Sequence, residues 1–173
     1  GHVMSARDLA ILANHLIKTY PEYYHYFSQK EFTFNKHTFR NRNPLIWEEL
    51  GVDGLKTGYL QESGYGLVAS AKRGDQRVIE VVAGLETKNE REDEPKKLLE
   101  WGFKNFKPYR LFDKGQQISD ALVWGGEARY VPLLGEDDIE VILPVTTSGK
   151  ITAQIVYQGP IKAPIRKGDK VAA

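Results

Sequence analysis

Residues Val52–Leu85 read VDGLKTGYLQESGYGLVASAKRGDQRVIEVVAGL, and this stretch decides the fold. It contains runs of strand character that are rich in apolar and β-branched residues and that end at short polar joints. Joints of this length suit antiparallel hairpins. The stretch therefore predicts an antiparallel sheet of three strands, which we place at 52–60, 64–72 and 77–85.

The residues before this sheet begin with a predicted helix. Ser5-Ala6-Arg7-Asp8 has the form of a capping box, and apolar residues then recur at helical spacing until Pro21 ends the pattern. Glu31–Asn35 alternates like a strand, and Asn41–Pro44 has the composition of a turn. Between the helix and this strand stands an aromatic cluster that we expect to pack in the core against the helix: Tyr23, Tyr24, Tyr26 and Phe27.

The sequence changes character at Pro108. Before it, Thr87 opens a charged segment whose helical apolar face includes Phe106. After it, helical periodicity gives way to short strand-like runs between glycine, proline and acidic turns. These runs are 109–112, 121–124, 130–134, 139–143 and 151–157, and Lys170–Ala173 reads as the start of a further strand.

The predicted fold class is α+β in two domains. Residues 5–107 form a domain with an antiparallel sheet and helices, and residues 108–173 form a small all-β domain of sandwich type. Gly1–Met4 reads as a remnant of a cloning tag.

Composition excludes several classes of protein. The 173 residues carry 24 Lys plus Arg and 23 Asp plus Glu, a net charge of +1, and this balance argues against a nucleic-acid partner. No apolar run approaches the roughly 20 residues that cross a bilayer. A hydrophobic content of 41% with 11% aromatic residues is typical of a folded chain.

The sequence also argues against thiol, metal and nucleotide chemistry. It contains no cysteine, and the histidines at positions 2, 15, 25 and 37 lack the paired spacing of metal ligands. Its glycine-rich segments lack the spacing of dinucleotide-binding or phosphate-binding loops. We therefore expect no metal and no cofactor.

The strongest chemical signal is Lys56-Thr57-Gly58, on a predicted strand just before a turn. The triplet in this setting resembles the serine D-alanyl-D-alanine carboxypeptidases, the low-molecular-mass penicillin-binding proteins, in which a Lys-Thr-Gly triad lies along the active site. The part after Pro108 is similar to the β-rich domain that follows the catalytic domain in this family. Further stretches fall in family order and extend the resemblance over nearly the whole chain from Ser5: Ala6–Ala10, Glu31–Asn35, Asn41–Asn43, Val52–Gly54, Gly64–Ala71 and Lys97–Phe103.

The resemblance implies a role for each residue of this strand. The Lys56 ammonium attracts the free carboxylate of a peptide that ends in D-Ala-D-Ala, and the Thr57 hydroxyl hydrogen-bonds that carboxylate or carries protons near it. Gly58 leaves the strand free to lie against substrate. The backbone N–H of Tyr59 is one of two oxyanion-hole donors.

Two arginines are assigned by the resemblance alone. Arg42 and Arg91 match arginines that flank the site in the family and help to bind the substrate carboxylate. The residues themselves leave a surface or structural role equally open for both.

The motifs that supply the nucleophile in this family do not occur in the chain. They are Ser-x-x-Lys and Ser-x-Asn, and in the family both precede the helix that begins here at Ser5. Neither spacing is found at any serine, namely Ser5, Ser28, Ser63, Ser70, Ser119 and Ser148. The resemblance therefore implies the C-terminal part of such an enzyme, cut inside its catalytic domain and short of the closing strands and membrane anchor. Without a nucleophile no acyl-enzyme forms, so we expect this part to be inactive alone.

Two other interpretations stay open. The first is a fragment related to a serine β-lactamase, which the β-rich extension after Pro108 disfavours because those enzymes end with their catalytic domain. The second is a non-catalytic binding or spacer module of the cell envelope.

The resemblance also implies partners and a location. The substrate would be a peptidoglycan stem peptide that ends in D-Ala-D-Ala, and the full-length enzyme would bind β-lactam antibiotics. The parent would be exported to the cell envelope, in the periplasm or on the outer face of the cytoplasmic membrane, with membrane contact only through the missing anchor. Loss of N-terminal strands would leave the 77–85 strand at a sheet edge, which favours self-pairing between copies.

Overall fold

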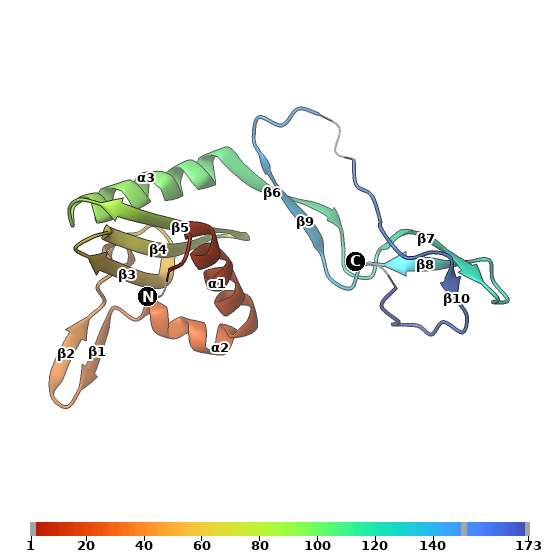
Figure 1. Ribbon diagram of the computed structural model, residues 1–173, viewed down its shortest axis with the longest axis horizontal. Coiled ribbons are helices and arrows are strands. Elements are labelled where there is room, and N and C mark those ends of the chain that lie inside the picture. Colours follow the sequence, from red (N-terminus) through yellow and green to blue (C-terminus); the bar gives the residue numbers. More distant parts are fainter. Residues whose placement is uncertain (1–2, 150–151, 172–173) are drawn as a thin grey trace. The chain divides into compact units, whose positions relative to one another are not determined.

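The computed structural model describes residues 3–149 and 152–171 (Figure 1). The chain separates into two compact units, Gly1–Phe106 and Lys107–Ala173, and each is described by itself.

The first unit is built on the sheet that the sequence predicts. Its strands β3 (Val52–Leu60), β4 (Gly64–Arg73) and β5 (Gln76–Leu85) are antiparallel and lie in the order β3-β4-β5. The turn between β4 and β5 pairs Arg73 with Gln76 and contains Gly74 at φ +59°, a conformation that glycine adopts without strain. All three predicted strands and both hairpins are confirmed.

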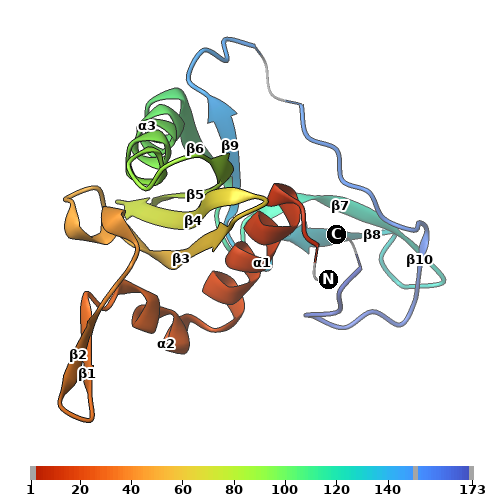
Figure 2. The ribbon, with the colours of Figure 1, turned by 60° about the vertical axis from the view of Figure 1, so that its left-hand side comes forward.

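Two helices cover opposite faces of this sheet, as Figure 2 shows: α1 (Ala6–Thr19) on one face and α3 (Glu90–Asn105) on the other. The predicted start of α1 is confirmed, because the Ser5 hydroxyl accepts the Asp8 N–H at 3.2 Å and the Asp8 carboxylate accepts the Ser5 N–H at 2.9 Å. The helix α3 lies close to β5, since a Cβ at Gly102 would stand 3.2 Å from a methyl carbon of Val78.

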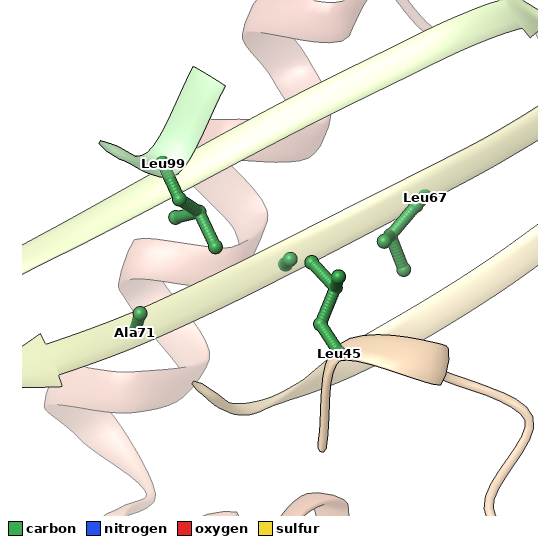
Figure 3. Close-up of a cluster of buried hydrophobic side chains, with 5 residues drawn as sticks. Leu45, Leu67, Ala71 and Leu99 are labelled. Atoms are coloured by element: carbon green, nitrogen blue, oxygen red, sulfur yellow. The ribbon is translucent and has the colours of Figure 1, made fainter. Parts of the chain in front are cut away.

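A buried cluster lies under α3. It brings Leu99 of α3 and Leu45 of the short helix η2 (Pro44–Trp47) against β4, and Figure 3 shows both leucines pointing at the strand that carries Leu67 and Ala71. A second cluster on the α1 side joins Ala13, Tyr24 and Leu55. Burial of these apolar side chains on both faces holds the two helices to the sheet.

The aromatic segment after α1 forms two short helices, α2 (Pro21–Tyr24) and η1 (His25–Ser28). Tyr24 is buried and Phe27 packs against the core, as expected. The expectation is wrong for Tyr23 and Tyr26, whose exposed fractions are 60% and 59%. Neighbouring residues of a helical turn point in different directions, so a continuous aromatic run cannot all face one core.

A hairpin projects from the first unit (Figures 1 and 2). Its strands are β1 (Glu31–Phe34) and β2 (His37–Arg40), and the second was not predicted. Asn35 belongs to the turn rather than to the strand, because Asn35 and Lys36 have φ +48° and +65°. A two-residue turn with both φ values positive matches the twist of a hairpin.

The second unit is β-rich, as the sequence predicts. Its strands form two sheets, β10-β7-β8 and β6-β9. The strands are β6 (Phe106–Phe112), β7 (Gln117–Trp124), β8 (Tyr130–Leu134), β9 (Ile139–Pro144) and β10 (Ile161–Lys162).

Three details of the predicted C-terminal half need correction. Phe106 begins β6 and is not part of the helix, which ends at Asn105. Residues 152–157 form no strand, and Tyr157 instead contacts β7 through its hydroxyl, which accepts the Leu122 N–H at 3.1 Å. The strand expected from Lys170 is absent at positions 170–171, while Ile151 and positions 172–173 lie outside the described residues.

Candidate functional site

The Lys56-Thr57-Gly58 triplet lies in the middle of β3. Lys56 pairs with Val68, Thr57 with Leu67, and Gly58 with Gly66 of β4, so its backbone is fixed by the sheet on one side. In the sheet order β3-β4-β5, β3 is an edge strand within the described residues. An edge strand can pair through its backbone with an extended peptide.

The side chains of the triplet differ in exposure. Thr57 is buried, with 8% of its surface exposed, whereas Lys56 is exposed and its Nζ donates to the Thr57 carbonyl at 2.6 Å. A Cβ built on Gly58 would meet no atom within 4 Å, so the space beside this residue is open. Tyr59 is also exposed, and its ring lies 4.3 Å from that of Tyr65.

A cavity of about 490 Å³ opens beside this strand. It brings Arg42 together with Lys56 and Thr57, and Arg40 is a third cationic residue in its lining. Its lining is contributed by the end of the β1–β2 hairpin, the turn after it and the middle of β3: Phe39, Arg40, Asn41, Arg42, Asn43, Leu55, Lys56 and Thr57. A space with cations at its wall is suited to an anion such as a carboxylate.

Arg42 stands between two anchored asparagines. The Asn41 side-chain amide donates to the carbonyl oxygens of Phe27 and Gln29, at 3.0 and 2.9 Å. The Asn43 side chain is fully buried; its amide donates to the Gly54 carbonyl at 2.9 Å and its oxygen accepts the Leu45 N–H at 3.1 Å. The turn that carries Arg42 is therefore tied both to the segment that precedes β1 and to β3.

Arg91 lies elsewhere in the first unit. It is on α3, and its guanidinium carbon stands 5.3 Å from the centre of the Tyr65 ring, a cation–π contact. It does not line the cavity. Because Tyr65 pairs with Tyr59, Arg91 approaches the strand beyond the triplet, and its Nε is buried without a hydrogen-bond partner among the described residues.

A polar network supports the beginning of β3, and the sequence reasoning did not find it. Arg77 donates to both oxygens of Asp53 at 2.8 Å, and also to the Ser70 hydroxyl at 2.6 Å. The Tyr24 hydroxyl donates to the same carboxylate at 2.8 Å. The hydrogen bond to Asp53 raises the pKa of Arg77, and burial raises the pKa of Tyr24. The only available signal was an acidic residue near the start of one predicted strand and an arginine near the start of another.

A second, mostly apolar cavity of about 370 Å³ borders the same triplet from the side of α1. Leu9, Leu12 and Leu16 of α1 form one wall. Lys56, Thr57 and Gly58 also line this cavity, so Lys56 and Thr57 border both a charged space and an apolar one.

Metal and membrane signals are absent from the described part of the chain. Across residues 3–149 and 152–171, no group of three or more His, Asp or Glu side chains is placed to hold a metal ion. Within the same ranges, every helix is too short or too polar to span a lipid bilayer.

Comparison with protein families gives two matches. Residues 1–87 match the family described as D-alanyl-D-alanine carboxypeptidase, and residues 106–173 match the C-terminal domain of penicillin-binding protein 5. Among curated proteins, the chain is 40% identical to D-alanyl-D-alanine carboxypeptidase DacA of Haemophilus influenzae over 96% of its length, and 37% identical to DacD of Escherichia coli over 99%. It spans 43% and 45% of those relatives, less than half of each.

The chain also superposes on solved structures of penicillin-binding proteins. Penicillin-binding protein 5 of Haemophilus influenzae superposes with a TM-score of 0.81 at 40% identity, over 97% of this chain and 50% of that one. Penicillin-binding protein D2 of Listeria monocytogenes, in its ampicillin-bound form, superposes with a TM-score of 0.53 at 39% identity, over 56% of this chain and 40% of that one.

Proposed function

Because the chain belongs to the D-alanyl-D-alanine carboxypeptidase family, we propose that its Lys56–Gly58 strand binds the terminal carboxylate of a peptide that ends in D-Ala-D-Ala. The single observation that carries this proposal is the cavity in which Arg42, Lys56 and Thr57 meet. The match of residues 106–173 to a penicillin-binding-protein domain supports a carboxypeptidase over a β-lactamase.

The charges at the cavity favour an anionic end group. Lys56 is exposed and its ammonium donates to the Thr57 carbonyl, from which it can turn toward a carboxylate. Arg42 supplies a second cation to the lining of the same cavity. The Thr57 hydroxyl adds a donor that is neutral and able to relay a proton.

The strand itself favours an extended peptide. The open space beside Gly58 leaves room for a substrate backbone, which a side chain at this position would fill. With the peptide paired along the edge of β3, the Tyr59 N–H is one of the donors that stabilise the oxyanion. Arg91 acts from the far end of the strand, where its contact with Tyr65 keeps a positive charge near Tyr59.

The complete reaction needs groups that these residues do not supply. In the serine mechanism a hydroxyl attacks the carbonyl carbon of the penultimate D-Ala, the terminal D-Ala leaves, and water then hydrolyses the ester. The sequence holds no Ser-x-x-Lys and no Ser-x-Asn. We therefore expect the 173 residues to bind the peptide without cleaving it, and the second unit to serve as a spacer or partner surface.

The proposed substrate sets the location and partners. A stem peptide of peptidoglycan lies outside the cytoplasmic membrane, so the protein that contains this chain would act in the cell envelope. The ampicillin-bound relative supports β-lactam binding by the whole enzyme.

The experiment is a titration of the isotope-labelled chain with acetyl-D-Ala-D-Ala, followed by NMR. We expect shifts at residues 54–59 that saturate, and a loss of affinity of about tenfold in Lys56→Ala, because one charge-assisted hydrogen bond is worth about 1.5–3 kcal/mol. Lys72→Ala, which removes an exposed lysine from β4 of the same sheet, is the matched control. Equal affinity of the wild type and Lys56→Ala would contradict the proposal.

A further inference from the structure

The sheet β10-β7-β8 of the second unit has one covered face and one open face. The side chains on the covered face are buried or half-buried, and they are Ala121 and Val123 of β7, Val131 and Leu133 of β8, and Ile161 of β10. Side chains alternate along a strand, so the residues between them point to the other side of the sheet. We call this second side the open face.

The open face carries two exposed aromatic rings. Tyr130 of β8 pairs with Leu122 of β7, and Trp124 follows Leu122 by two residues and therefore lies on the same side. The exposed fractions of Trp124 and Tyr130 are 66% and 52%. Diagonal neighbours on adjacent strands lie about 7–8 Å apart, so the two rings form one platform.

Charged side chains border the two rings. Lys162 of β10 pairs with Trp124, so its exposed side chain leaves the sheet on the open face. The guanidinium carbon of Arg129 stands 5.7 Å from the centre of the Tyr130 ring. Asp120 lies on the same face of β7 and adds an acceptor. The platform therefore has two cations and one carboxylate at its border.

This combination suits a sugar ring. A pyranose presents C–H groups on its flat sides and hydroxyl groups around its edge. The flat side can stack on an indole or phenol ring, which buries apolar area, while the hydroxyls reach polar side chains beside the ring. Trp124 and Tyr130 offer the stacking surface, and Lys162 and Asp120 offer a donor and an acceptor next to it.

The open face is less suited to a protein partner. Stable protein interfaces bury about 800 Å² on each side, and charged residues are depleted from their centre. Here Lys162, Arg129 and Asp120 stand on the same face as the rings, and they interrupt any larger apolar area. The two cations instead favour a ligand that carries carboxylates.

We propose that the open face binds the glycan strand of peptidoglycan, with sugar rings stacked on Trp124 and Tyr130 and a sugar carboxylate at Lys162 or Arg129. This strand alternates two N-acetylated amino sugars, and one of them bears a lactyl group whose carboxylate is free wherever no peptide is attached. The choice of this polymer rests on the proposed function, because the stem peptide hangs from it. The open face belongs to the second unit, whereas the proposed peptide site belongs to the first.

The test titrates the isotope-labelled 173-residue chain with a peptide-free tetrasaccharide in which N-acetylglucosamine and N-acetylmuramic acid alternate, followed by NMR. We expect the indole N–H signal of Trp124 and the backbone signals of Tyr130 and Lys162 to shift and to saturate. Trp124→Thr should lower the affinity about tenfold, because a stacking surface is lost.

A second saccharide tests the role of the cations. Tetra-N-acetylchitotetraose has the same number of sugar rings and no carboxylate. We expect the wild type to bind it about three- to fivefold more weakly than the first tetrasaccharide, which is the range for an exposed ion pair. The double variant Lys162→Gln, Arg129→Gln should bind both saccharides with equal affinity.

Matched controls separate recognition from misfolding. Threonine keeps strand propensity and Trp124 is exposed, so Trp124→Thr should retain the sheet. Tyr109→Thr removes an exposed aromatic ring from β6, in the other sheet of the second unit, and should bind as the wild type does. Lys107→Gln on β6 is the matching control for the charge variants. The indole signals of Trp47 and Trp101, both in the first unit, should stay in place.

The outcomes distinguish this inference from the proposed function. If the tetrasaccharide does not bind, or if Trp124→Thr binds it unchanged, the inference is overturned, and the titration with acetyl-D-Ala-D-Ala still decides the peptide site. If the saccharide binds and that peptide does not, the proposed function fails and the open face stands. Equal affinity of the wild type for both saccharides would refute the carboxylate contact. If light scattering shows a dimer that Trp124→Thr dissociates, the open face binds a second copy of the chain, and the inference is wrong.

Discussion

The side-chain amide of Asn43 donates a hydrogen bond of 2.9 Å to the carbonyl oxygen of Gly54, two residues before Lys56. The same side chain accepts the N–H of Leu45, and it is buried with 1% of its surface exposed. One side chain therefore joins the turn that carries Arg42 to the strand that carries Lys56. The distance between the Arg42 and Lys56 side chains therefore depends on the Asn43 side chain.

Removal of this side chain should be costly. In Asn43→Ala the Gly54 carbonyl and the Leu45 N–H both lose their partner in a buried place, at about 1–3 kcal/mol each. We expect the free energy of unfolding to fall by about 2–4 kcal/mol in chemical denaturation. Asn89→Ala changes an exposed asparagine at the start of α3 whose side chain makes no capping hydrogen bond, and it should change little. A loss below about 0.5 kcal/mol in Asn43→Ala would contradict the assigned role.

The network of Asp53, Arg77 and Tyr24 should act as one unit. Arg77→Met leaves the Asp53 carboxylate, which is 29% exposed, with the Tyr24 hydroxyl as its remaining donor in this network. We expect the free energy of unfolding to fall by about 1–3 kcal/mol. Asp53→Asn has a similar effect. The double variant loses less free energy of unfolding than the sum of the two single losses, as in any coupled pair. Lys97→Met, which breaks an exposed pair with Glu94, is the control. Strict additivity in a double-mutant cycle would show that the network is not coupled.

Glu80 should make stability depend on pH. The residue lies on β5, opposite Ala69 of β4, and is 5% exposed. Neither of its carboxylate oxygens has a hydrogen-bond partner among the described residues. Burial raises the pKa of its carboxyl from 4.5 to about 8. The unfolded chain releases this proton near pH 4.5 and the folded chain near pH 8, so the folded state is favoured most below pH 4.5 and loses stability as the pH rises to 8.

The matching variant is Glu80→Gln, which keeps the shape and removes the titration. Because one unit of pKa corresponds to about 1.4 kcal/mol, we expect its stability relative to wild type to rise by about 4–5 kcal/mol between pH 4 and pH 9. The measurement is urea denaturation at several pH values. Glu62→Gln at the exposed β3–β4 turn serves as the control. A difference between Glu80→Gln and wild type that stays constant with pH would refute the buried, protonated state.

The chain should not be acylated by penicillin. The reaction needs a serine activated by a lysine, and neither serine motif of the family occurs in the sequence. Incubation with a fluorescent penicillin, followed by denaturing electrophoresis, should leave the band unlabelled. A whole penicillin-binding protein of the same family is the positive control. Labelling that disappears when the protein is boiled first would show that a nucleophile is present after all.

Local chemistry made much of the first unit predictable. The strands β3 to β5 follow from apolar runs between short joints, and the start of α1 follows from the Ser5–Asp8 capping box. The triplet Lys56–Gly58 was placed on a strand before a turn, which is where it lies. These features depend on a few neighbouring residues, and the sequence therefore carries them directly.

Other features depend on contacts that no local pattern reveals. The strand β2 was missed because Asn35 and Lys36 form the turn, and its exposed residues show no buried alternation. Residues 152–157 have strand composition, yet within the described chain they meet β7 through the Tyr157 hydroxyl. Asn43 and Gly54 are 11 residues apart, and Tyr24 and Asp53 are 29 apart. Composition alone cannot pair residues at such separations.

The central claim is that the wall formed by Arg42, Lys56 and Thr57 binds a peptide carboxylate. The most direct measurement compares the dissociation constants of acetyl-D-Ala-D-Ala and of its C-terminal amide, by NMR titration of the same labelled sample. The two ligands differ only in the charge of the end group. We predict that the amide binds at least about tenfold more weakly, since it loses charge-assisted hydrogen bonds to two cations. Equal affinities for the acid and the amide would contradict the account.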